Sequence, residues 1–371
     1  MRASCAIKEI METKSSPYGG CASKDAAVTP TSIGGQAVIE GVMMRGKYSW
    51  AVSARDAAGT IHSEEHELSS ASRKNAWMRW PIVRGVVALV ESLVLGTKAL
   101  TASAVLAGVD EESGEEMPAG AMVGALVAGG LLAVGLFIVL PAVLTNFIVG
   151  PATVNPMKWN IVDGVLRVVA FFLYIWLIGF FPELKRVYMY HGAEHKTIHM
   201  LEHGEELTVE NARKYPTLHV RCGTAFLLMV MVVSILVFSL IPIKAIITGM
   251  GLTNTYAVLG IVILSRIILM PIVAGLSYEI TVKWAGPRAE KPYVRFLLWP
   301  GLQMQRFTTA PPTDDMLECA IASTKMVLET AARREHPEEF RIHDEGTSDG
   351  SASDRSSGAI PAEFDLLDDF L

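Results

Sequence analysis

The residues best suited to chemistry lie in one short stretch, His191-Gly-Ala-Glu194-His195. At about 100° per residue of a helix, His191, His195 and Glu202 fall within about 40° of one another. Glu194 and His199 flank this face. The order His-x-x-Glu-His is the inverse of the His-Glu-x-x-His of zinc hydrolases, and both put two imidazoles one turn apart beside a carboxylate. The stretch therefore predicts a metal site that can also move a proton.

Each residue of this stretch can be given a role in such a site. In zinc hydrolases two histidines and a third His or carboxylate hold the ion, and a nearby Glu takes a proton from water. We therefore expect a divalent metal, most simply Zn²⁺, at His191 and His195, with Glu194 as general base. A turn near residues 215–216 would bring later residues back to this helix. The candidates for the third ligand are Glu202, His219 and Glu210.

The same residues also have a simpler interpretation. A polar helix close to a membrane often carries histidines that are only solvated or hydrogen-bonded. Five of the nine histidines lie between residues 191 and 219, and this clustering favours the metal site. His203 lies about 80° from His195 around the helix and is expected at the surface. Both interpretations stay open at this point.

Two arginines could stabilise negative charge on a substrate. They are Arg221, near the histidines, and Arg45, which follows glycines and Glu40 in the N-terminal part of the chain. Flexible backbone beside a carboxylate and a guanidinium suits an edge that faces a site. Tight turns in a surface hairpin would produce the same composition.

The composition is that of a membrane protein with soluble parts. Of the 371 residues, 51% are hydrophobic and 19% charged, and the mean hydropathy is +0.35. The formal net charge is −6, with acidic residues concentrated after His336, so no nucleic-acid partner is expected. The four cysteines form no CxxC pair, which indicates a reducing compartment without structural disulfides.

The N-terminal 108 residues change from a polar stretch to short apolar runs and then to an apolar stretch with a charged stripe. Residues 1–31 are polar, lack an apolar core and are predicted to be disordered, not a signal peptide. Residues 32–76 hold short apolar runs and a turn at Ala58–Gly59, which predict a small β-rich cap. In residues 77–108, Arg84, Glu91 and Lys98 recur every seven positions. This charged stripe predicts an amphipathic or interfacial helix rather than a lipid-facing span.

Four later stretches are long and apolar enough to cross about 30 Å of hydrocarbon. They are residues 120–148, 161–181, 223–248 and 255–280. We therefore expect transmembrane helices 1–2 within 120–181 and helices 3–4 within 223–280, with the His-rich segment 182–222 between the pairs. Arg266, deep in the last span, is expected inside the bundle, near Glu279 or the bundle axis, most simply in an ion pair.

The remainder of the chain is predicted to leave the membrane again. Residues 281–340 should form a helical segment that begins with a turn at residues 299–301 and a short amphipathic piece. A second helix should be capped by Thr313–Asp314–Asp315 and reach about Glu335. Residues 341–371 are rich in Ser, Gly and Asp and are predicted to be a disordered acidic tail.

The basic residues predict the orientation in the membrane. The segment 182–222 contains six Lys or Arg, whereas 149–160 has only Lys158 and 249–254 has none. By the positive-inside rule the His-rich segment, the cap and both termini should be cytoplasmic. The fold class is therefore a mainly α, multi-pass protein of the cell membrane, with about four transmembrane helices, an interfacial helix and a small β-rich N-terminal cap. Its expected partners are the lipid bilayer and a membrane-associated substrate, and the sequence does not indicate an oligomeric state.

Four runs of sequence resemble the YqhQ-type family of bacterial membrane proteins. They are GGQAVIEGVMMRG at 34–46, YHGAEHKTIH at 190–199, LTVEN at 207–211 and HVRCGT at 219–224. The resemblance covers about residues 31–335 and implies a multi-pass protein from a family described as a domain of unknown function and as a predicted metal-dependent enzyme. The chain departs from the family pattern at Val220, where a proline is expected.

Two functions from different classes follow. The first is a membrane-anchored metal-dependent hydrolase that acts on a lipid-linked, membrane-protein or peptide substrate. The second is a non-catalytic scaffold or regulator with a structural or sensory site, which His219-x-x-Cys222 supports because thiolates are common in closed zinc sites. A closed four-ligand site with Cys222 would favour structure, and an open position beside Glu194 would favour catalysis. A transporter is a weaker third function, since Arg266 alone is clearly charged and intramembrane.

Overall fold

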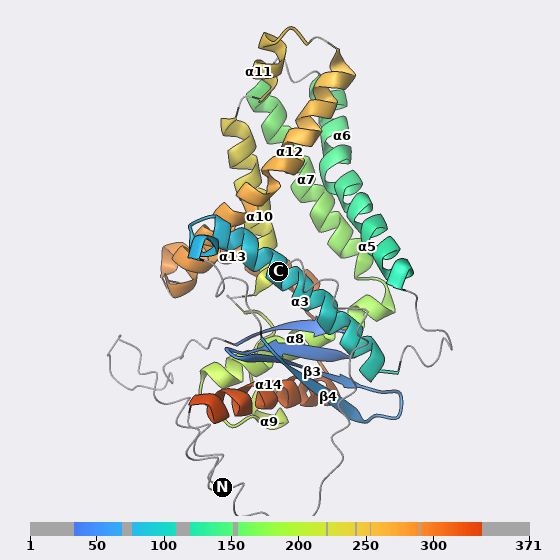
Figure 1. The fold of residues 1–371 in the computed structure, drawn as a ribbon, viewed down its shortest axis with the longest axis vertical. Coiled ribbons are helices and arrows are strands. Elements are labelled where there is room, and N and C mark those ends of the chain that lie inside the picture. Colours follow the sequence, from blue (N-terminus) through green and yellow to red (C-terminus); the bar gives the residue numbers. More distant parts are fainter. Residues whose placement is uncertain are drawn as a thin grey trace, which may run out of the picture.

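The computed structural model describes residues 33–68, 76–108, 119–150, 155–219, 222–241, 243–252, 254–288 and 291–335. The described chain forms a bundle of apolar helices at one end and a layer of sheet and helices at the other (Figure 1). This confirms the predicted mainly helical fold with candidate membrane-spanning helices and a small N-terminal sheet. The predictions for residues 1–31 and 341–371 lie outside the described residues.

The sheet is a four-stranded antiparallel meander in the order β1-β2-β3-β4. Its strands are β1 (Gly34–Val38), β2 (Gly41–Arg45), β3 (Ser49–Arg55) and β4 (Ile61–Glu67). Side chains alternate between its two faces, as the period of two requires: Val42 and Met44 join one buried cluster, whereas Met43 joins another. Gly59 adopts a φ of 89° in the turn between β3 and β4, a conformation that glycine adopts easily.

Helices cover both faces of this sheet. On one face lie α8 (Pro182–Glu202) and α14 (Asp314–Glu335), and the short α9 (Val209–Arg213) packs beside them. The other face is covered by α3 (Val83–Leu106), whose Ala99 and Ala102 contact Trp50 and Val52 in one cluster. The extent of α14 agrees with its predicted start and end. Because both faces are covered, the central strands β2 and β3 are almost entirely buried.

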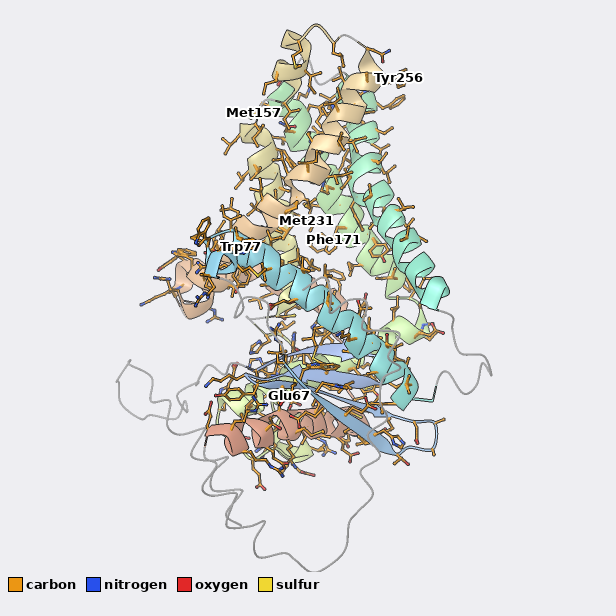
Figure 2. All side chains as sticks on the ribbon, in the orientation of Figure 1. Glu67, Trp77, Met157, Phe171, Met231 and Tyr256 are labelled. Atoms are coloured by element: carbon orange, nitrogen blue, oxygen red, sulfur yellow. The ribbon has the colours of Figure 1, made fainter. Side chains whose placement is uncertain are left out.

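The apolar bundle is built from helices on both sides of α8 in the sequence. Its members are α5 (Ala119–Val134), the π-helical η2 (Gly135–Val139), α6 (Leu140–Val149), α7 (Pro156–Ile178), α10 (Gly223–Leu240), α11 (Ile243–Gly249) and α12 (Thr255–Tyr278). Met157 and Tyr256 project outward from the bundle, whereas Met231 is buried (Figure 2). Exposed apolar side chains of this kind suit a lipid environment.

The helices long and apolar enough to cross a membrane differ in part from the predicted spans. They are Val83–Leu106, Val127–Val149, Met157–Ile178 and Tyr256–Ala285. The predicted span 223–248 is divided into α10 and α11, with Pro242 between them in the sequence. Proline lacks the N–H that a continuous helix needs at this position. Helix α3 meets the same criterion of length and composition.

Helix α3 nevertheless lies between the bundle and the sheet (Figure 1). The second half of α3 packs on the sheet, and its first half crosses α12 where Gly85 meets Gly275 in close backbone contact. Arg84 of α3 forms an ion pair with Glu279, at the start of the π-helical η3 (Glu279–Ala285). The interfacial position of residues 77–108 stays a prediction, since α3 is long and apolar enough for a span.

The predicted turn at residues 299–301 was wrong. One helix, α13 (Pro292–Thr308), runs through Pro300, which costs it a single intrahelical hydrogen bond. Packing against α10 buries Met304 and Gln305 on one side of α13 and offsets this loss. The short helices η1 (Ala76–Arg79) and η4 (Gly286–Arg288) complete the described elements.

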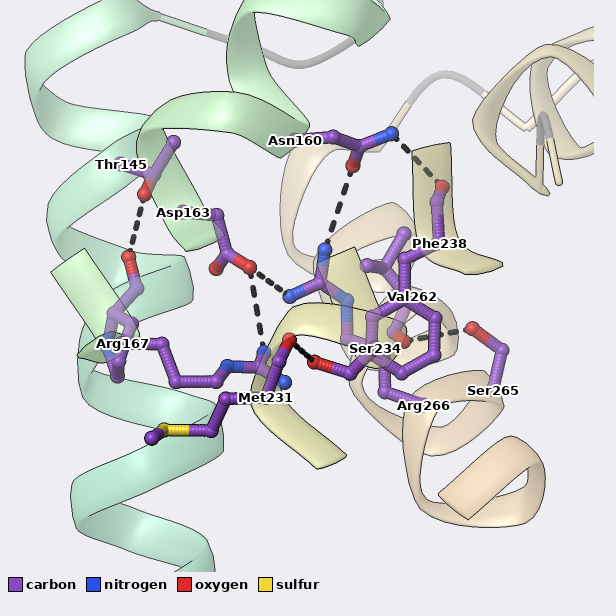
Figure 3. A network of polar contacts seen from close by, with 11 residues as sticks. Thr145, Asn160, Asp163, Arg167, Met231, Ser234, Phe238, Val262, Ser265 and Arg266 are labelled. Atoms are coloured by element: carbon purple, nitrogen blue, oxygen red, sulfur yellow. Dashed lines mark hydrogen bonds and ion pairs between the residues drawn. The ribbon is translucent and has the colours of Figure 1, made fainter. Parts of the chain in front are cut away.

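A buried ionic network joins α7 to α12 inside the bundle (Figure 3). Asp163 accepts hydrogen bonds from Arg266 and from Arg167, the latter at 3.3 Å. Arg266 also lies over the rings of Trp159 and Phe238. The predicted internal ion pair is confirmed, but the suggested neighbour Glu279 was wrong because it pairs with Arg84. The argument against a transporter assumed that Arg266 was the one charged residue within the membrane. The bundle also contains Asp163 and Arg167.

Candidate metal centre

Helix α8 carries the predicted site and is held closely by its surroundings. A Cβ added at Gly192 would lie 2.2 Å from the carbonyl O of Ala310, so only a glycine allows this approach. The N–H of Ala310 donates to the carbonyl of Tyr188 at 2.9 Å. Arg186 and Glu40 form an ion pair that fastens α8 to the turn between β1 and β2. These contacts bring the end of α13 alongside the histidines.

His191, His195 and Cys222 form the first group of possible ligands, which we call triad A. One ligand atom from each lies within 4.8 Å of the others. The Nε2 atom of His191 is 3.2 Å from the Sγ atom of Cys222, and the two imidazole rings have centroids 4.4 Å apart. Two helical residues one turn apart and a cysteine at the start of α10 therefore converge on one point.

Hydrogen bonds at Nδ1 of His191 and His195 leave Nε2 of each ring available to coordinate a metal ion. Nδ1 of His191 donates to the carbonyl of Thr308 at 2.8 Å, and Nδ1 of His195 donates to the carbonyl of Thr217. A histidine that donates through Nδ1 keeps a lone pair on Nε2, which is the usual arrangement of a metal ligand. Nε2 of His195 is buried beside the Cys222 thiol and lacks a well-aligned hydrogen bond within the described residues. Triad A therefore fits a divalent ion such as zinc.

His199, Glu202 and His219 form a second group, triad B, whose ligand atoms also lie within 4.8 Å of one another. Nε2 of His219 is 3.2 Å from Oε2 of Glu202. Nε2 of His199 donates to the carbonyl of Leu218 at 2.8 Å, which leaves Nδ1 as the acceptor nitrogen. Glu202 and His219 are both only 3% exposed.

Triad B is next to triad A. The rings of His195 and His219 have centroids 5.7 Å apart, and those of His199 and His219 are 4.6 Å apart. Gln305 of α13 fixes the backbone of His219, accepting from its N–H and donating to its carbonyl, each at 2.8 Å. The loop that follows α9 is thereby held against α8.

Glu194 interacts electrostatically with His191 of triad A and with His219 of triad B. The backbone N–H of Gly35 hydrogen-bonds its carboxylate, and a Cβ at Gly35 would lie 2.7 Å from Cγ of Glu194. Burial raises the pKa of the Glu194 carboxyl above its ordinary value, and His191 and His219 act in the opposite direction. A raised pKa makes a carboxylate a stronger base.

Burial also keeps His195, His199 and His219 in the form that binds metals. It lowers the pKa of His199 to about 4, with its neighbouring histidines acting in the same direction. Desolvation lowers the pKa of His195 and of His219 as well. Neutral imidazole is the form that coordinates a metal ion.

The structure divides the predicted ligands between the triads. His191 and His195 belong to triad A, whereas Glu202 and His219 belong to triad B. The alternative third ligand Glu210 is exposed on α9. Arg45 forms an ion pair with Glu91 of α3 at 3.5 Å. Arg221 lies outside the described residues, so its predicted role stays a prediction.

Two residues of the triads were missing from the predicted ligand set. His199 was assigned only to the flank of the helical face, although its spacing of three residues from Glu202 brings both to one side of α8. Cys222 was considered only for a structural site. Its signal was the spacing His219-x-x-Cys222, but the structure places these two residues in different triads.

Comparisons with known proteins cover the part of the chain that contains both triads. Residues 80–330 match the family described as "Protein of unknown function (DUF1385)". The chain is 30% identical over 319 residues to "Uncharacterized protein YqhQ" of Bacillus subtilis (strain 168), a match that covers 82% of this chain and 95% of that protein. No solved structure matches.

Proposed function

The chain belongs to the DUF1385 family of unknown function, and from the geometry of its centre we propose that it is a membrane-anchored metal-dependent hydrolase. The observation that carries this proposal is triad A itself. The half-buried His191 and the buried His195, one turn apart, present Nε2 toward the same thiol, while backbone carbonyls hold both Nδ1 atoms. Glu194, a buried carboxylate, lies next to His191.

In this proposal His191, His195 and Cys222 hold the ion. A divalent ion bound there supplies a Lewis acid that polarises a substrate oxygen and acidifies water. Within the described residues the group contains three protein donors, which supports a fourth position open to substrate. An open position beside Glu194 is the arrangement that favours catalysis over a closed structural site.

Glu194 serves as the general base. Its carboxylate accepts the proton of the attacking water, and its raised pKa increases its strength as a base. The N–H of Gly35 fixes the orientation of the carboxylate before the proton is transferred. We keep Arg45 and Arg221 as proposed stabilisers of developing negative charge. Arg45 would have to exchange its contact with Glu91 for the substrate.

The position of the centre favours a substrate associated with the membrane. Triad A joins α8, in the sheet layer, to Cys222, immediately before the apolar helix α10. Thr308, at the end of α13, supplies one of the carbonyls that orient it. A lipid-linked, membrane-protein or peptide substrate could reach a site at this level without leaving the membrane surface.

The thiol of Cys222 supports a second candidate function. A thiolate ligand is common in closed structural zinc sites, and Sγ of Cys222 is 3.2 Å from His191. Triad A would then be the structural or sensory site of a non-catalytic scaffold or regulator. In that case the ion would stabilise the fold and Glu194 would have no role in turnover.

The first experiment measures the metal content of the detergent-purified protein by elemental analysis. We expect divalent metal in the wild type and a loss of one ion per chain in His195→Ala. His62→Ala, an exposed histidine of β4, is the matched control and should leave the content unchanged. A folded wild type without metal would overturn the proposal.

The second experiment separates the hydrolase from the scaffold. Glu194→Gln keeps the shape of the side chain but removes the base, so it should retain the metal and the fold. Hydrolysis would be assayed on a panel of ester, phosphoester and peptide substrates, and the variant should lose at least about 100-fold in rate. A wild type that binds metal but hydrolyses none of them would support the scaffold, and unchanged turnover in Glu194→Gln would remove the assigned role.

A further inference from the structure

We propose that the centre is dinuclear, with a second divalent ion bound by His199, Glu202 and His219. This inference rests on the proposed function only in that the first ion occupies the neighbouring triad A. The second ion would have its own ligands, none of which it shares with the first. The required donors are already together: two imidazoles and one carboxylate, a ligand set used by zinc peptidases.

The distances within triad B suit a bound ion. Two ligand atoms at about 2.0–2.1 Å from a tetrahedral zinc ion are about 3.3 Å apart. Nε2 of His219 and Oε2 of Glu202 are 3.2 Å apart, and all three ligand atoms lie within 4.8 Å. The same 3.2 Å contact serves as a hydrogen bond when no ion is bound.

The side chains of triad B are oriented in advance by contacts outside it. The carbonyl of Leu218 accepts from Nε2 of His199, which leaves Nδ1 of this ring as the nitrogen with a free lone pair for coordination. The amide of Gln305 is fully buried and makes both of its described hydrogen bonds to the backbone of His219. Such supporting hydrogen bonds around ligands are typical of metal sites and raise affinity, because less ordering remains to be done on binding.

The two triads are arranged as neighbours along one helix. His191, His195, His199 and Glu202 follow one another on α8, and the ring of His219 lies between the two groups, 5.7 Å from His195. Glu194 interacts electrostatically with a histidine of each triad. In two-metal hydrolases, paired ions stabilise both the attacking and the leaving oxygen. A second ion at triad B would therefore act on the same substrate as the first.

The test is the number of ions per chain, measured by elemental analysis after saturation with Zn²⁺ and removal of excess metal. We expect two in the wild type, one in Glu202→Gln and one in His195→Ala. Glu210→Gln, an exposed carboxylate on α9, is the matched control and should keep two. His199→Ala provides a second variant of triad B, and size-exclusion chromatography in detergent verifies that each variant is folded.

The outcomes distinguish this inference from the proposed function. One ion in the wild type that is lost in His195→Ala but kept in Glu202→Gln would overturn the second site and leave the hydrolase proposal intact. One ion lost only in Glu202→Gln and His199→Ala would contradict the assignment to triad A. Electron paramagnetic resonance of the Mn²⁺-loaded protein gives an independent readout, since two ions this near each other broaden each other's signal by dipolar coupling and a single ion does not.

Discussion

For the histidines of α8, the hydrogen bond at one ring nitrogen determines what the other nitrogen can do. Carbonyls of Thr308 and Thr217 hold Nδ1 of His191 and His195, whereas the carbonyl of Leu218 holds Nε2 of His199. Each of these imidazoles therefore keeps one acceptor nitrogen. A solvated histidine face would show exposed rings, but His195 is 1% exposed. The hydrogen-bonded form of the simpler interpretation agrees with the same contacts, so metal analysis has to separate it from the metal site.

The contact between Gly35 and Glu194 can be tested with two adjacent glycines. In Gly35→Ala the new Cβ would lie 2.7 Å from Cγ of Glu194 and 2.8 Å from Sδ of Met44, so the carboxylate must move. We expect a loss of about 1–3 kcal/mol in the free energy of unfolding, typical of overpacking. Gly34→Ala is the control, because its Cβ would meet nothing within 4 Å. Chemical unfolding in detergent measures both, and equal effects would refute the contact.

Gln305 gives a second prediction for a single residue. Gln305→Leu removes both partners of the His219 backbone, and each buried polar group left unpaired costs about 1–3 kcal/mol. We expect a clear fall in the thermal unfolding temperature and weaker metal binding at triad B. Gln303→Leu, at a half-buried position on the same helix, should change both much less. The assignment fails if the two variants unfold at the same temperature.

Among the elements, α7 and α12 are joined by charges that are costly to bury unpaired. Asp163 is shared by Arg167 and Arg266, and the side chains of all three are at most 5% exposed. The rings of Phe238 and Trp159 provide further attraction for the guanidinium groups. The network therefore fixes how these two helices pack in the bundle.

The shared carboxylate predicts an asymmetry between two variants. Asp163→Asn leaves two buried guanidinium groups without a carboxylate, and breaking a buried ion pair costs about 3–5 kcal/mol. Arg167→Met leaves the pair between Asp163 and Arg266 intact and should cost less. Heating each variant in detergent and monitoring the loss of its monodisperse peak in size-exclusion chromatography shows which variant is less stable. A larger loss in Arg167→Met than in Asp163→Asn would contradict this account.

For the whole molecule, the apolar bundle and the sheet layer are at opposite ends, with α3 between them (Figure 1). Helix α11 is at the far end of the bundle, and the β3–β4 hairpin belongs to the sheet layer. The basic residues of segment 182–222 are concentrated around α8 and α9, at the sheet end. We therefore propose that the sheet layer and both triads face the cytoplasm.

This orientation predicts which engineered cysteines can be labelled from outside the cell. Met250→Cys, next to α11, should react with a membrane-impermeant maleimide on intact cells, whereas Ala58→Cys in the β3–β4 turn should not. Both positions are exposed in the structure. The unmodified protein controls for the native cysteines, and permeabilised cells should label at both positions. The reverse pattern would invert the proposed topology.

The sequence alone determined the features that depend on neighbouring residues. Short apolar runs and the turn at Ala58–Gly59 indicated the small sheet, and the length of apolar runs indicated most of the spans. The capping residues Thr313–Asp315 predicted where α14 begins. The spacing of His191, His195 and Glu202 also placed all three on one stripe of a helix. These predictions succeeded because helix and strand periodicity act over a few residues.

Only the tertiary structure decided which distant side chains meet. The loop after α9 brings His219 to Glu202 and His199, while Cys222 reaches His191 and His195, so the expected four ligands are divided between two triads. The same holds for Arg266, which pairs with Asp163 across 103 residues, and for Arg45, which meets Glu91. Such pairings depend on how helices pack and where loops return, and local spacing carries no information about either.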